Sequence, residues 1–99
     1  MNIFKIKELA IRLEQELVAH SKIDPESIGL HSDLKPLLEA AKAEKILAPL
    51  ETRDVPGRYR FTERNLQQYE ELEDAFAKFA IEVTGGEPPA LKLFRESRK

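Results

Sequence analysis

The stretch from Leu34 to Leu72, LKPLLEAAKAEKILAPLETRDVPGRYRFTERNLQQYEEL, decides the fold that this sequence predicts. Residues 33–45 carry leucine and alanine at helical spacing, which predicts a helix. Residues 46–53 and 58–62 read as two short strands joined by a Val-Pro-Gly turn at 55–57. Alternation along the second strand places Tyr59 and Phe61 on one face and arginines on the other. We therefore expect a helix, a small β-hairpin and then a long helix.

Upstream of this stretch, the segment SKIDPESIGLHSDL is dense in helix start and stop signals. Asp24 is a good N-cap, Pro25 suits the first helical position, and Gly29 suits a left-handed cap. Ser32 is then expected to cap the helix over 33–45. A short helix, a turn with glycine and a second helix form the local pattern of a helix-turn-helix. The alternative is any two helices joined by a tight corner.

Two long amphipathic helices are expected at the ends of this region. Residues 3–19 form the first, with one apolar face and a second apolar stripe that recurs every seven residues. The last helix, with Thr62 as its N-cap, carries a heptad seam from Tyr69 to Val83. Each of these surfaces either packs within the domain or meets a second subunit. The candidate protein-interface residues are Phe4, Ile11, Val18, Tyr69, Leu72 and Phe76.

The elements in order give a mainly α protein with a small β-hairpin (α+β), in the order helix, helix, helix, hairpin, long helix. This order is that of a winged helix-turn-helix. We expect one domain over residues 1–84, followed by a basic tail over 85–99 that begins with Gly85-Gly86 and contains Pro88-Pro89.

Residues 37–47 (LLEAAKAEKIL), residues 57–63 (GRYRFTE) and the long helix resemble bacterial winged-helix regulators of the PadR or MarR kind. The resemblance covers about residues 24–83. In such families a recognition helix leads through a glycine turn into a wing, which returns through a Y-R-L-T-E strand into a dimerisation helix. The turn glycine is absent from this chain, where Glu44-Lys45 occupy its place. The resemblance implies a homodimeric transcriptional regulator that binds double-stranded DNA.

In this hypothesis the cations of the wing contact phosphates, and those of the recognition helix lie along the major groove. The candidate DNA-binding residues are Lys35, Lys42, Arg53, Arg58, Arg60 and Arg64. A formal net charge of −2 argues mildly against DNA. A continuous basic stripe joining four of these residues (Lys35, Lys42, Arg58 and Arg60) would support DNA.

The alternative function is a non-enzymatic protein-interaction module, such as a complex subunit or a small acidic inhibitor or immunity-type protein for a basic toxin or nuclease. Glu70, Glu71, Glu73 and Asp74 crowd one region of the last helix, which is typical of a solvated face or of a docking surface for a basic partner. A basic stripe that acidic side chains interrupt would support such a partner.

Sequence motifs for catalysis are not found. The chain has no cysteine, and His20 and His31 do not share a metal-type spacing with acidic residues. We find no phosphate-binding loop and no nucleophile motif. We therefore expect neither an enzyme nor a metal or cofactor site. Charges recur throughout, so we expect no membrane span and a cytoplasmic location.

Overall fold

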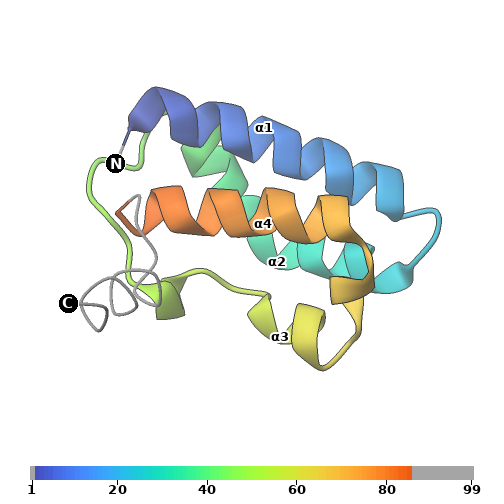
Figure 1. Cartoon of the computed structure of the whole chain (residues 1–99). Helices are drawn as coiled ribbons and strands as arrows, with labels where there is room; N and C mark the ends of the chain where they lie inside the picture. The colour runs from blue at the N-terminus through green and yellow to red at the C-terminus, as the bar shows by residue number, and fades with distance from the viewer. Residues whose placement is uncertain (1, 86–99) are drawn as a thin grey trace.

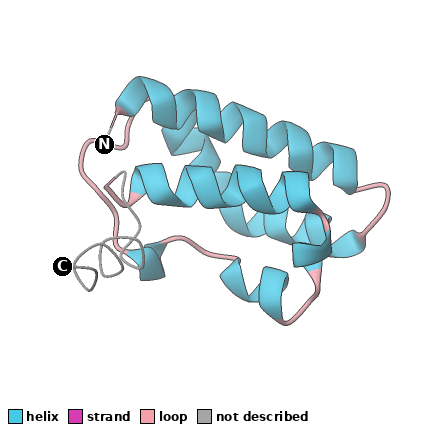
Figure 2. Ribbon diagram, viewed as in Figure 1, coloured by secondary structure: helices cyan, strands magenta, loops and turns pink. Residues whose placement is uncertain are grey.

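The structure is a computed structural model that describes residues 2–85, and within that range it is all helical (Figure 2). Three long helices, α1 (Ile3–His20), α2 (Pro25–Lys42) and α4 (Glu70–Val83), form the body of the molecule. A short helix, α3 (Arg58–Thr62), and two 3-10 turns, η1 (Thr52–Asp54) and η2 (Leu66–Gln68), lie in the connection between α2 and α4. Figure 1 shows α1 along one side of the molecule and α3 on the opposite side.

The first helix confirms the prediction from its periodicity. Asn2 caps α1 by accepting the backbone N–H of Lys5 at 3.1 Å, so the helix begins where the chain's apolar repeat begins. Its main stripe is buried against both α2 and α4. The buried residues of this stripe are Ile6, Ala10, Leu13 and Leu17.

The prediction of two separate helices over 24–45 is wrong, because α2 runs without a break from Pro25 to Lys42. Asp24 is its N-cap as expected, but Gly29 and Ser32 lie inside the helix and cap nothing. The reason is an apolar stripe that continues through the expected turn, with buried residues spaced three or four apart. These residues are Ser27, Leu30, Leu34, Leu38 and Ala41.

A left-handed residue follows α2 at the place where the winged-helix resemblance lacks its turn glycine. Glu44 has φ 58°. Its N–H donates to the carbonyl of Ala41 at 3.1 Å, and the N–H of Lys45 donates to Ala40 at 2.9 Å. This pair of bonds is a Schellman motif with glutamate in the position that favours glycine.

The predicted β-hairpin is also wrong. Residues 44–69, here called the cover segment, contain no strand and instead run along the side of the molecule opposite to α1 (Figure 1). Its buried side chains are Ile46, Val55, Phe61 and Leu66. The spacing of these buried side chains fits neither a helix nor a strand, and most of the segment is accordingly irregular. A long-range backbone bond adds to them, from the Leu50 N–H to the carbonyl of Val83 at 2.8 Å.

The expected second strand is helix α3, which begins after Gly57. Gly57 has φ 94°, and a Cβ at this position would collide with the side chain of Leu30. Phe61 is buried while Tyr59 is 41% exposed, so the two aromatics do not share a face as strand alternation predicted. Without a hairpin the chain has no wing, so the α+β winged-helix fold is replaced by an all-helical one.

The last helix starts later than predicted. Thr62 belongs to α3, Asn65 has φ 64°, and α4 begins at Glu70 with Tyr69 as its cap. From there the predicted seam is present, and it faces the domain's own core against α1. Its buried members are Leu72, Phe76, Phe79 and Val83. The tail predicted from residue 85 lies, from residue 86 onward, outside the described residues.

Candidate functional site

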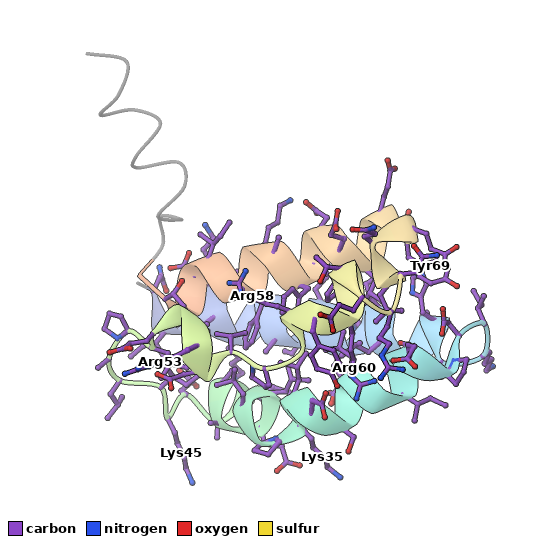
Figure 3. All side chains as sticks on the ribbon, turned by 90° about the horizontal axis from the view of Figure 1, so that it is seen from below. Lys35, Lys45, Arg53, Arg58, Arg60 and Tyr69 are labelled. Atoms are coloured by element: carbon purple, nitrogen blue, oxygen red, sulfur yellow. The ribbon has the colours of Figure 1, made fainter. Side chains whose placement is uncertain are left out.

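Arg60 is partly buried and paired within the fold, although the sequence analysis placed it on a DNA-binding surface. Its Nε donates to Asp33 at 2.9 Å and its Nη1 to Glu26 at 2.7 Å, both on α2 (Figure 3). Its side chain is only 17% exposed and passes over Gly29, where an added Cβ would be 2.7 Å from its Cζ. Burial works to lower the pKa of Arg60, but the bonds to Asp33 and Glu26 outweigh it and raise the pKa. Arg60 therefore clamps α3 onto α2.

Lys42 also forms an ion pair with a carboxylate of this chain. Its Nζ donates to Glu14 on α1 at 2.6 Å, and the other carboxylate oxygen of Glu14 lies 3.1 Å from Nε2 of His31. The bond from Lys42, followed by that with His31, lowers the pKa of Glu14. This cluster ties α1 to α2, so Lys42 contributes little positive potential to the surface.

The remaining predicted cations are scattered. Arg53 is exposed and pairs with Glu51 at 2.8 Å, and Arg64 lies 3.9 Å from Glu26. Lys35 and Arg58 have no carboxylate within 4.0 Å among residues 2–85. Since Lys42 and Arg60 are internally paired, the four-residue basic stripe that would have supported DNA is interrupted twice.

A surface groove of about 440 Å³ lies between α3 and the middle of α4. The rings of Phe61 and Phe76 pack at a centroid distance of 4.7 Å beneath it, and each residue is 5% exposed. The guanidinium of Arg58 lies 6.0 Å from the Phe76 ring centroid. The lining residues are Arg58, Tyr59, Phe61, Thr62, Glu73, Phe76 and Ala77.

The groove has opposite charges at its two sides. Arg58 comes from α3, and Glu73 comes from α4. Glu70 lies about one turn before both Glu73 and Asp74, on the exposed outer face of α4, and does not line the groove. Asp74 instead reaches Arg12 of α1 at 3.1 Å and Lys78 at 3.2 Å, and these bonds lower its pKa. The carboxylate at the groove is thus that of Glu73, while Asp74 pairs with Arg12 of α1.

Part of this acidity has a structural explanation. Glu70, Glu71 and Glu73 lie in the first turn of α4, where carboxylates stabilise the positive end of the helix dipole. The acidic row alone is therefore no site. The groove next to it is a separate feature, because side chains of both α3 and α4 form it.

The six predicted interface residues fall into two sets. Phe4, Ile11 and Val18 are 65%, 39% and 51% exposed on the outer face of α1. Leu72 and Phe76 are buried within the chain.

Tyr69 belongs with the internal set. Its hydroxyl donates to Asp24 at 3.1 Å, and its ring lies 5.0 Å from that of His20. Burial, followed by the bond to Asp24, raises the pKa of Tyr69. Of the predicted interface, only the α1 stripe is left facing outward.

A second hollow, of about 410 Å³, lies beside α1 and α2. Glu14, His31 and Lys35 line it, and Glu14 is already bound by Lys42. Over residues 2–85 no group of three or more histidine and carboxylate side chains is placed to hold a metal ion. In the same part of the chain, none of the helices combines the length and the apolar character needed to cross a bilayer.

The sequence analysis placed Arg58 and Phe76 among the candidate site residues but missed the other residues that line the groove. Tyr59 was expected to face a core, and Glu73 was treated only as part of the acidic row. The sequence holds no local signal for this groove, because side chains of both α3 and α4 are needed to form it. Comparison with protein-family models, with curated proteins and with solved structures finds no match to this chain.

Proposed function

We propose that this chain is a non-enzymatic protein-interaction module that binds a basic segment of a partner protein in the groove between α3 and α4. The observation that carries the proposal is the groove itself, which has aromatic rings at its base and an exposed aromatic, Tyr59, at its edge. Aromatic and arginine side chains at a concave, partly apolar surface are typical of the centre of protein interfaces.

Charge indicates the chemistry of the partner. Glu73 at the groove and Glu70 one turn away favour a segment with lysine or arginine beside its apolar anchor. Lys42 and Arg60 argue for the same kind of partner, because both already pair with carboxylates of this chain. These carboxylates are those of Glu14, Glu26 and Asp33. Few cations are then left on the surface to contact the phosphates of a nucleic acid.

The experiment is a selection of short random peptides displayed on phage against the purified full chain. Enriched peptides should combine one large aromatic or aliphatic residue with neighbouring lysine or arginine. Glu73→Lys should weaken the best peptide at least tenfold, which is about 1.4 kcal/mol of binding free energy. Tyr59→Ala should weaken it through loss of the anchor's contact.

Glu71→Lys is the matched control, because it makes the same charge change on the same helix. Glu71 lies three residues before Asp74, on the side of α4 that meets Arg12 of α1, and not at the groove. Equal losses from Glu71→Lys and Glu73→Lys would reduce the effect to net charge and contradict the proposal. Enrichment of no peptide, together with low-salt binding of random duplex DNA that Arg58→Glu abolishes, would replace it by nucleic-acid binding.

A further inference from the structure

The sequence of this chain contains a segment with the chemistry that the groove demands. Residues 91–95 read Leu-Lys-Leu-Phe-Arg, and residues 92–99 hold four basic side chains against one acidic. Large apolar residues therefore alternate with cations, as an anchor beside Glu73 and Glu70 requires. The groove and this segment form a complementary pair within one polypeptide.

The length of the connection permits the two to meet. Ala77 lies eight residues before Gly85, which places the groove about 12 Å back along the axis of α4. Leu91 lies six positions after Gly85 in the sequence, and a stretch of that length spans up to about 20 Å when extended. Residues 91–95 thus have the reach to lie over Phe76 and Glu73 without any change in the helices.

We propose that residues 86–99 bind in the groove between α3 and α4 of the same molecule, with Phe94 as the apolar anchor and Lys92 or Arg95 facing Glu73. This inference rests on the proposed function, because it treats the groove as a site for basic peptides. Its consequence is regulatory: an external partner must displace this segment, so the apparent affinity of the partner falls by the fraction of molecules in which the groove is occupied.

The chain has no cysteine, so one introduced thiol can carry a nitroxide spin label without background. We would label Ser97→Cys in the full chain and measure paramagnetic broadening of backbone amide signals. Docking should broaden Tyr59, Thr62 and Ala77 selectively, relative to amides on the outer face of α2. Glu73→Lys should remove this broadening, while Glu71→Lys should keep it. Unchanged amide dispersion in each variant shows that the fold is retained.

Two results would overturn the inference. One is the absence of selective broadening at the groove. The other is broadening only between isotope-labelled and spin-labelled molecules in a mixed sample, which would assign the segment to the groove of a second copy.

The failures of the two proposals are distinguishable. A selected peptide that binds the groove of a chain showing no broadening overturns the self-docking and leaves the proposed function standing. Selective broadening that no selected peptide relieves overturns the proposed function instead, and leaves the segment as a fixed part of the fold.

Discussion

Replacement of Gly29 by alanine should destabilise this protein, although the same change in the middle of an ordinary helix stabilises it. In a helix interior alanine is favoured over glycine by about 1 kcal/mol. Here the new Cβ would be 2.7 Å from Cζ and 3.0 Å from Nη2 of Arg60. The guanidinium would have to leave its place above α2.

The cost of that displacement follows from the two bonds that Arg60 makes. A hydrogen bond to a charged group contributes about 1.5–3 kcal/mol, but Glu26 and Asp33 remain 28% and 32% exposed, and solvent screens them. About 1 kcal/mol for each bond gives a loss of about 2 kcal/mol. Against the gain in helix propensity, the net destabilisation is about 1 kcal/mol, or roughly 4–8 °C in Tm for a domain of this size.

The assay is urea unfolding of the Gly29→Ala, Arg60→Ala and double variants, followed by far-ultraviolet circular dichroism. The Arg60→Ala background removes the clash with the guanidinium, so Gly29→Ala should stabilise there by about 1 kcal/mol. The change of sign corresponds to a coupling energy of about 2 kcal/mol. Ser32→Ala, at an exposed position of the same helix, should behave alike in both backgrounds. Equal stabilisation by Gly29→Ala in both backgrounds would refute the clamp.

Three further predictions follow from named contacts. Glu44→Gly should raise the free energy of unfolding by about 1 kcal/mol, because glycine adopts φ 58° without strain. The Glu44 carboxylate also lies 3.5 Å from Nζ of Lys7, so a loss of stability would mean that this ion pair outweighs the strain, and Lys7→Ala measures the pair directly. Gly57→Ala should cost about 3 kcal/mol from left-handed strain and overpacking, and a cost below about 1 kcal/mol would show that the site relaxes freely. Glu14→Gln should cost about 1 kcal/mol at neutral pH. The folded-state pKa of Glu14 lies below its ordinary value of 4.5, so its contribution to the free energy of unfolding is complete above that pH and is lost as the pH falls through the folded-state pKa. The stabilities of wild type and variant should therefore converge in acid. A difference in urea midpoint that does not depend on pH would contradict this.

Sequence reasoning succeeded where a single periodic stripe decides the structure. The stripes of α1 and α4 place their core residues at spacings of three and four, and only a helix brings such residues to one face. The same test would have joined the two pieces of α2, because Leu30 and Leu34 continue one stripe across the expected turn. Local stop signals at Gly29 and Ser32 favour a break, but the continuous apolar stripe prevails in the structure. Glycine suits position 29 because the side chain of Arg60 passes over it, and this contact between distant parts of the chain cannot be read from the local sequence.

The β-hairpin predicted for the cover segment is wrong for a different reason. Arg58 to Thr62 alternates apolar and basic side chains, and five residues are too few to distinguish a strand from one turn of helix. Tertiary packing decides between them, because Phe61 reaches Phe76 while Arg60 reaches α2. The groove was beyond prediction on the same grounds, since it exists only where α3 happens to cross α4.

The backbone N–H of Asn2 donates to the carboxylate of Glu82 at 2.9 Å, a hydrogen bond between positions 80 residues apart. Glu82 is 8% exposed and also lies 3.6 Å from Lys5, so the start of α1 is fastened to the last turn of α4. During synthesis α1 and α2 leave the ribosome before α4 and can pack together early. The apolar face of α1 that packs against α4 stays exposed to solvent until residue 83 has left the exit tunnel. The core is therefore completed only after α4 has been synthesised, and a chain stalled within α4 should present that unburied face of α1 to chaperones.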